Sequence, residues 1–406
     1  MIFRLLQQLR VALFLLLSLL TLSQVAAEEE ATSFRFRFRE GERFRILGIN
    51  RQEVYFNEAL SHSAVIVTRV VEETTAVDEA GAVLEATYQV TEENLGTTRA
   101  YNVEKEYSAR FGRSFNGEHR ELDRGFMPVS RSFPAFPETP LQPGESWSTE
   151  AYEVHDFRRG YGIQEPYRFS MPVAYRYEGP TEREGTPADL IEASYNIFHQ
   201  GPDYPRAQFY PRTITGTSEQ ELYWDRELGR VRYSEEEYTF LFVLNTGDRV
   251  EYRGTATYEL VEIPALDRRS LREELVAAER SEEGLSVEER KEGVTIVLRE
   301  VYFEPDSPEL TESAARTISR IGEVLRRVPE NDILVTGHTA FAGSREGREA
   351  LSAERARRVA EAIVAEGSHR EEQVLYRGVG ARRPAASNAT EEGRRRNRRV
   401  EITILE

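Results

Sequence analysis

The chain has 406 residues, a formal net charge of −17, 39% hydrophobic residues and 30% charged residues. This length predicts two or three domains, and the composition is typical of a globular protein rather than a disordered or membrane-embedded one. An acidic chain repels phosphate backbones, so we expect no nucleic-acid partner. The sequence contains no cysteine, which excludes disulfides, thiolate metal sites, cysteine nucleophiles and the lipidated cysteine of a bacterial lipoprotein.

Residues 1–27 are predicted to be an export signal peptide. Arg4 and Arg10 supply positive charge around the start of an apolar run over residues 11–22. Small residues at Val25 and Ala27 then mark a cleavage point, and we expect removal after Ala27. The alternative is an uncleaved anchor helix, but the apolar run is shorter than the roughly 20 residues that a membrane span needs.

Residues 28–264 are predicted to form an all-β antiparallel domain, either a sandwich or a curved meander. Apolar and polar residues alternate over segments such as 33–39 and 250–253, and this period of two places one face of a strand on a core. An outer-membrane barrel would also alternate, but many of these strands carry Thr or Glu at positions where a lipid-facing band must be apolar. We therefore favour a sheet that is surrounded by water.

A proline-rich stretch over residues 127–144 interrupts this β pattern. Because proline cannot donate a hydrogen bond to a β ladder, the stretch is predicted to be a long connection. It would be the boundary if the region formed two domains. We favour one domain, since the strands that follow need a partner sheet.

The remainder of the chain changes from period two to mixed periods. Residues 265–284 carry Leu271 and Leu275 among charged residues, which predicts an amphipathic helical linker that ends at Gly284. Residues 285–406 are predicted to be an α+β domain of order βαβαββ, with its helices on one face of a small mixed sheet. The two helix faces are expected at Ala314, Ile318, Ile321, Leu325 and Val328, and at Leu351, Ala356, Val359, Ala360 and Ile363.

Four sequence blocks in this last region resemble the OmpA-like C-terminal domain family. They occur in the family's order and spacing, and they fall on the predicted strands and helices. The blocks are residues 301–307 with Leu310; residues 335–339 with Gly343 and Ser344; residues 351–356; and residues 378–380 with Pro384, 388–394 and 397–401.

This resemblance implies non-covalent binding of the peptidoglycan stem peptide. In the family, an arginine in the third block takes a carboxylate of diaminopimelate, and an Asp after Gly-His-Thr takes its ammonium group. The arginine corresponds to Arg355, whereas the Asp position is occupied by Ala340. Loss of one member of such a buried charged pair costs about 2–5 kcal/mol. The residues that the resemblance assigns to the peptidoglycan site are Arg355, Thr339, Ala340, Gly343, Ser344, Arg348, Leu351, Asn397 and Arg398.

Three interpretations of Ala340 remain open from the sequence. Glu346, in the same loop, could supply the missing carboxylate. The ligand could be a stem peptide with a different diamino acid. Alternatively, the domain has lost wall binding and kept its fold.

No catalytic motif points to an enzyme. The sequence has no Gly-x-Ser-x-Gly elbow and no phosphate-binding loop, and its six histidines lack the close spacing of a metal site. We therefore expect no enzymatic activity, no cofactor and no metal, and a packing role for His338. The expected location is the periplasm, associated with the outer membrane or the cell wall, where the β-rich domain contacts an outer-membrane or periplasmic protein.

Overall fold

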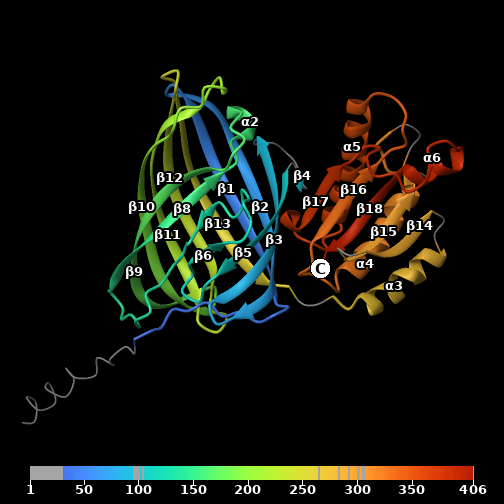
Figure 1. The fold of residues 1–406 in the computed structure, drawn as a ribbon. Helices are drawn as coiled ribbons and strands as arrows, with labels where there is room; N and C mark the ends of the chain where they lie inside the picture. Colours follow the sequence, from blue (N-terminus) through green and yellow to red (C-terminus); the bar gives the residue numbers. More distant parts are fainter. Residues whose placement is uncertain are drawn as a thin grey trace, which may run out of the picture.

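The computed structural model describes residues 31–94, 101–102, 105–263, 266–281, 284–290, 293–299, 302–303 and 307–405. The predicted signal peptide lies outside these residues. Figure 1 shows two regions side by side, a large curled sheet and a smaller region of helices and strands. No helix among the described residues is long and apolar enough to cross a membrane.

The first region is one continuous sheet of 12 strands in the order β6-β5-β3-β2-β1-β13-β12-β11-β10-β9-β8-β7. The order follows the chain almost throughout, so the curved meander is confirmed and the sandwich alternative is wrong. Its strands are β1 (Arg43–Phe56), β2 (Ala59–Asp78), β3 (Gly81–Asn94), β5 (Lys105–Arg113), β6 (His119–Glu121), β7 (Ser130–Arg131), β8 (Ser146–His155), β9 (Tyr167–Arg183), β10 (Thr186–Gln200), β11 (Pro211–Asp225), β12 (Arg230–Leu244) and β13 (Arg249–Glu262).

Strand β9 shows why these residues form a curled sheet with a filled interior. Tyr167, Phe169, Tyr175 and Tyr177 alternate along it and are buried, whereas the residues between them are exposed. Aromatic side chains from β9 and β10 form a common core with Trp224 of β11. Large rings suit the interior of a wide, curled sheet because each buries 150–250 Å² of surface. Polar residues such as Arg168 and Glu178 occupy the opposite face.

The proline-rich stretch lies between β6 and β8 and contains β7, so it connects the two end strands of this sheet. The end strands β6 and β7 are short, and side chains connect the segments around them. Glu121 on β6 accepts hydrogen bonds from Arg131, with an Nη1–Oε1 distance of 3.4 Å, and from Arg168, with an Nη1–Oε2 distance of 3.1 Å. Phe136 from the stretch packs in the aromatic core. We call the β6–β7 gap, with Glu121, Arg131 and Arg168, the seam of the curled sheet. Side-chain hydrogen bonds therefore close this seam.

The alternating segment over residues 33–39 is not a strand, which corrects the sequence interpretation. Phe34 and Phe36 point into the core as the period predicted, while Arg35 and Arg37 are exposed. The backbone makes only single contacts with other segments, such as Phe36 N to Phe115 O at 2.8 Å. The segment runs along one end of the curled sheet (Figure 1). The alternation therefore arises because one side of the segment faces the core and the other faces solvent. The segment does not pair with a neighbouring strand among the described residues.

The second region is a six-stranded mixed sheet in the order β14-β15-β18-β16-β17-β4. Strands β16 and β17 are parallel, whereas β18 is antiparallel to both β15 and β16. The elements are β4 (Tyr101–Asn102), α3 (Arg268–Ser281), β14 (Leu285–Arg290), β15 (Gly293–Arg299), α4 (Glu312–Leu325), β16 (Ile333–His338), α5 (Arg345–Ala365), the 3-10 helix η2 (Glu371–Gln373), β17 (Val374–Gly378), α6 (Glu391–Asn397) and β18 (Arg399–Leu405).

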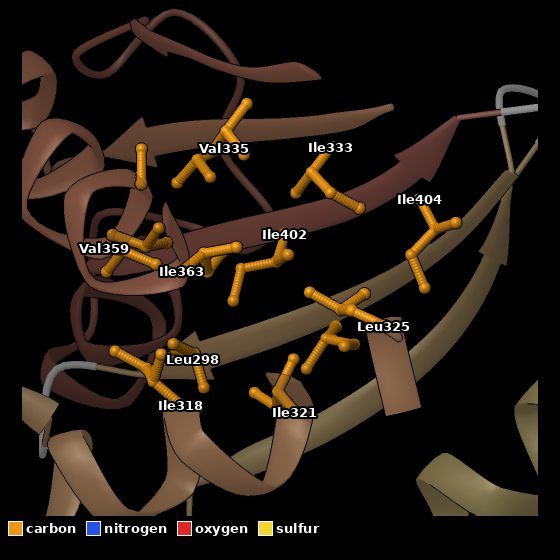
Figure 2. Close-up of a cluster of buried hydrophobic side chains, with 14 of the residues drawn as sticks. Leu298, Ile318, Ile321, Leu325, Ile333, Val335, Val359, Ile363, Ile402 and Ile404 are labelled. Carbon is orange, nitrogen blue, oxygen red and sulfur yellow. The ribbon is translucent and has the colours of Figure 1, made fainter. Parts of the chain in front are cut away.

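Both predicted helix faces pack on one side of this sheet. Figure 2 shows Ile318, Ile321 and Leu325 of α4 and Val359 and Ile363 of α5 gathered against the strands. Each helix begins at a hydroxyl cap, since Thr311 accepts a hydrogen bond from Ala314 N and Ser344 accepts one from Gly347 N.

Four elements differ from the sequence interpretation of the second region. Strand β14 and helix α6 were not predicted, and the C-terminal sheet gains β4 from the N-terminal part of the chain. Helix α3 is not a free linker, because Leu271 and Leu275 are buried in the same core as α4 and α5.

A short α2 (Arg158–Tyr161) lies in the connection between β8 and β9.

The two regions meet at a buried cluster of charges. Asp332, just before β16, forms ion pairs with Arg45 on β1 and Arg69 on β2, and all three side chains are 2% exposed. The Nη1 atom of Arg45 lies 2.8 Å from the Asp332 carboxylate and 2.7 Å from the Glu330 carbonyl oxygen. Strand β4 pairs with β17 in the same interface. These contacts make the curled sheet and the C-terminal sheet neighbours through both backbone and side chains.

Candidate functional site

Hydrogen bonds bring the four sequence blocks together at one end of the C-terminal sheet. The Nε atom of Arg355, in the third block, donates to the carbonyl oxygen of Ser307, in the first, at 3.0 Å. Gly380, in the fourth block, donates its backbone N–H to Ser352 Oγ in the third at 2.9 Å. Thr339, in the second block, donates to the carbonyl oxygen of Gly380 at 3.0 Å. Residues as far apart in the sequence as Ser307 and Gly380 therefore form one constellation.

Two glycines explain how helix α5 approaches the strands so closely at this point. A Cβ atom on Gly337 would lie 1.9 Å from the carbonyl oxygen of Ser352, and one on Gly378 would lie 2.4 Å from the backbone nitrogen of Ala353. No side chain larger than hydrogen fits at either position. The close approach is what lets Ser352 reach the loop after β17.

Arg355 lies on the buried side of α5. Its side chain is 3% exposed, and its guanidinium carbon lies 5.1 Å from the centre of the Phe303 ring. Together with the bond to Ser307, this contact fixes the guanidinium between α5 and the segment that leads into α4. The structure therefore brings the predicted arginine into the constellation, although it is enclosed rather than exposed in an open groove.

The loop after β16 begins with buried residues and then becomes exposed to solvent. Thr339 and Ala340 are buried, with 7% and 5% exposure, whereas Phe341 is 67% exposed. Arg348 lies over the Phe341 ring at 4.4 Å and donates to the carbonyl oxygen of Gly343 at 2.5 Å. Arg348 thus stabilises the loop itself, which the resemblance did not indicate. Phe341 was missed from the sequence, where an aromatic residue in a polar loop was the available signal.

Asn397 organises the other side of the constellation. It is fully buried, and its Oδ1 atom accepts the backbone N–H groups of Ala385 and Ala386 at 2.8 and 2.9 Å. Its Nδ2 atom donates to Asn388 Oδ1 at 3.0 Å, and the same oxygen accepts the N–H of Phe341 at 3.0 Å. A continuous hydrogen-bonded path therefore runs from α6 to the loop after β16, so Asn397 positions that loop.

The other predicted residues lie around this path with different roles. Arg398 donates to Glu391 at 2.9 Å, which ties the two ends of α6 together. Leu351 is half-buried on α5, and Ser344 caps the same helix. Glu346 is exposed in the first turn of α5.

A buried ionic cluster at His338 was not predicted from the sequence. Glu401 receives two hydrogen bonds from Arg290, at 2.6 and 2.9 Å, and one from Arg399 at 2.7 Å. His338 Nε2 lies 3.3 Å from the same carboxylate. Burial opposes the charge on Glu401, but the neighbouring side chains of His338 and Arg290 hold its pKa well below the usual range.

His338 itself is kept neutral by its surroundings. Burial lowers the pKa of His338 more strongly than Glu401 raises it. The cluster links β18 to β14 and β16, which supports the packing role expected for this histidine. Within the described ranges, no group of three or more His, Asp or Glu residues could hold a metal ion.

Comparison with known proteins agrees with this arrangement. Residues 302–398 match the model of the OmpA family. The C-terminal region is an OmpA-like domain. The match covers both the constellation and the helices that carry it.

Curated relatives match the same part of the chain. The probable lipoprotein YiaD of Escherichia coli is 34% identical over 124 residues, which is 30% of this chain and 56% of YiaD. The peptidoglycan-binding protein ArfA of Mycobacterium bovis is 36% identical over 104 residues, which is 26% of this chain and 32% of ArfA. The chain thus spans between about a third and just over half of the length of these relatives.

Solved structures also match part of the chain. The cell wall anchor of the T6SS from Pseudomonas aeruginosa is 28% identical, with 34% of this chain and 99% of that chain covered and a TM-score of 0.29. The peptidoglycan-associated lipoprotein from Burkholderia pseudomallei is 26% identical, with 25% and 86% covered and a TM-score of 0.24.

Proposed function

We propose that this protein attaches non-covalently to peptidoglycan through its OmpA-like domain, while the curled sheet contacts another component of the cell envelope. The expected location is the periplasm, next to the outer membrane or the wall. The ligand is the peptidoglycan stem peptide, and the protein acts as an anchor rather than as an enzyme.

The observation that carries this proposal is the convergence of the four blocks at the constellation around Arg355, Ser352 and Gly380. Segments that are distant in the sequence meet where the resemblance places the ligand. A guanidinium presents N–H donors in a planar fork that matches a carboxylate, so Arg355 is the group suited to an acidic end of the stem peptide. The relative ArfA, which is named as a peptidoglycan-binding protein, supports the same ligand.

Ala340 sets the expected affinity. An alanine offers no acceptor to the ammonium group of a diamino acid, so binding should be weaker than in a site with an Asp there. Replacement of Ala340 by Asp should raise affinity for a diaminopimelate wall. An unchanged affinity would show that this loop does not face the ligand.

Sedimentation with purified sacculi tests the proposal. The wild-type protein is expected to sediment with the sacculi, and Arg355→Gln should weaken this binding about tenfold or more, since it removes a charge-assisted hydrogen bond. Arg357→Gln is the matched control, because Arg357 lies on the same helix and pairs with Glu354 and Glu361 at the surface. Circular dichroism verifies that each variant is folded.

A second function has one observation in its favour. Arg355 is 3% exposed and Ala340 is 5% exposed, so both residues are largely shielded from a ligand in solvent. This fits a domain that has kept the OmpA-like fold for contacts with proteins and has lost wall binding. Equal sedimentation of the wild type and the folded Arg355→Gln variant would favour this function and contradict the proposed anchor.

A further inference from the structure

The end of the curled sheet that residues 33–39 cross contains a second candidate site. A cavity of about 590 Å³ lies against this segment, in the size range of small-molecule sites. Its lining includes Arg35, Arg37 and Arg226 together with the aromatic residues Phe36, Phe115 and Trp224. It belongs to the curled sheet and shares no residue with the constellation of the OmpA-like domain.

The cations of this cavity differ in how they are neutralised. Arg226 forms an ion pair with Asp189, which is fully buried, and donates to the hydroxyl of Tyr177 at 3.1 Å. Arg35 and Arg37 are exposed, and neither forms an ion pair with a carboxylate in the described part of the chain. Arg37 donates to the backbone carbonyl oxygen of Glu227 at 3.3 Å, which leaves its charge in place.

Aromatic rings form the apolar wall of the same cavity. Phe36 and Trp224 pack edge to face with ring centres 5.2 Å apart, and both are buried by the core behind them. Phe115 is half-buried, with the guanidinium of Arg35 4.4 Å above its ring. Cations therefore lie next to an apolar surface. Arg35 and Arg37 thus differ from Arg226, whose charge is paired with Asp189.

We propose that this cavity binds an amphipathic anion, that is, a carboxylate or phosphate group attached to an apolar chain. The head group would pair with Arg35 and Arg37, because guanidinium groups form charge-assisted hydrogen bonds with both kinds of anion. The apolar part would lie against Phe115 and the edge of the Phe36–Trp224 pair. This site goes beyond the proposed attachment to peptidoglycan and does not depend on it.

The position of Trp224 makes the proposal directly testable. The chain has two tryptophans, Trp147 and Trp224, and only Trp224 lines the cavity. In the Trp147→Phe protein, titration with dodecanoate or dodecyl phosphate, below micelle formation, should change the fluorescence of Trp224. The affinity should fall as salt is added, since the head-group contacts are exposed. The two ligands distinguish a carboxylate from a phosphate source.

Variants of the arginine segment separate this site from general detergent binding. Arg35→Gln combined with Arg37→Gln should weaken binding about tenfold or more. Arg39→Gln, the matched control, removes the same charge from the same segment outside the cavity and should leave the affinity within about twofold. Equal binding of uncharged dodecyl maltoside, or equal binding to the double variant, would overturn the proposal.

Three acidic residues that precede residues 33–39 allow a further test, which compares ligand binding with and without their charges. Glu28, Glu29 and Glu30 precede Arg35 closely in the sequence and carry the same sign of charge as the proposed head group. If a ligand bound only after all three were replaced by Gln, these residues would be the natural occupants and the proposal would be overturned. Similar binding with and without the three glutamates would support it.

Discussion

The curled sheet and the OmpA-like domain bury their apolar residues in different ways. The core of the curled sheet is dominated by Phe, Tyr and Trp, whereas that of the OmpA-like domain is built mainly from Ile, Leu and Val. A wide interior needs large rings to fill it, while a helix packed on a flat sheet needs compact side chains that interdigitate. The two cores therefore differ in the shape of their side chains, with aromatic rings in one and branched aliphatic groups in the other.

The largest expected effect comes from separation of the two regions. Asp332→Ala would leave the buried guanidinium groups of Arg45 and Arg69 without their shared carboxylate, at a cost of about 3–5 kcal/mol. Chemical denaturation should then show separate transitions for the two regions. Glu330→Gln is the control, since that carboxylate is 50% exposed and 4.0 Å from Arg45. A variant that unfolds like the wild type would show that the interface is weak.

Gly337→Ala should affect the OmpA-like domain alone. The added Cβ would lie 1.9 Å from the carbonyl oxygen of Ser352, so α5 must shift, at a cost of about 1–3 kcal/mol. Both tryptophans lie in the curled sheet, so their fluorescence should report an unchanged transition while the helical circular dichroism signal is lost earlier. Gly322→Ala in α4, where the nearest atom is Glu366 Cβ at 3.3 Å, should have a much smaller effect.

Acid should weaken the seam of the curled sheet. Burial, reinforced by Arg131 and Arg113, lowers the pKa of His119 to about 3. In the unfolded chain His119 takes up a proton near pH 6.5, whereas in the folded protein it stays neutral until about pH 3. The free energy of unfolding therefore decreases as pH falls from about 6.5 towards 3. Between pH 7 and 5.5 the loss should be about 1 kcal/mol.

His119→Phe tests this pH dependence. The new ring can retain the stacking on Phe111, whose ring centre lies 5.1 Å from that of His119, but it cannot take up a proton. Tryptophan fluorescence during denaturation at several pH values should show a flatter stability profile for the variant. An unchanged profile would assign the acid sensitivity to other groups.

The smallest expected effect is local to helix α4. Thr311→Ala removes the hydroxyl that accepts the N–H of Ala314 and should cost the OmpA-like domain about 0.5–1 kcal/mol. Thermal unfolding, followed by the helical circular dichroism signal, measures this loss of stability. Ser313→Ala, which removes a neighbouring hydroxyl that does not cap the helix, should change stability by less. Equal effects would contradict the capping role.

Local patterns predicted much of both folds. The period of three to four residues located the buried faces of α4 and α5, and the alternation over residues 33–39 predicted which side chains are buried. The same alternation could not show that this segment lacks a neighbouring strand, because pairing depends on distant residues. Strand β14 was missed because charged residues follow Leu285 and Val287, and its pairing with β15 is what makes it a strand.

The candidate site was predicted in part. The resemblance identified Arg355 and Asn397, and the structure brings both into or beside the constellation. The loop-stabilising role of Arg348 and the buried Glu401 cluster could not be predicted, because isolated charged residues in a sequence are normally solvated. The same reason hid Arg45, Arg69 and Asp332, which are distant in sequence and meet only after both regions have folded.

The pairing of β1 with β13 has a consequence for how the chain is made. These strands are adjacent in the sheet, yet about two hundred residues separate them, from Phe44 paired with Glu262 to Phe56 paired with Val250. A ribosome produces β1 first, so one edge of that strand has no partner until nearly two thirds of the protein exists. Unpaired strand edges attract other chains. The growing polypeptide therefore needs protection from aggregation over about half of its synthesis, and slow translation would prolong that need.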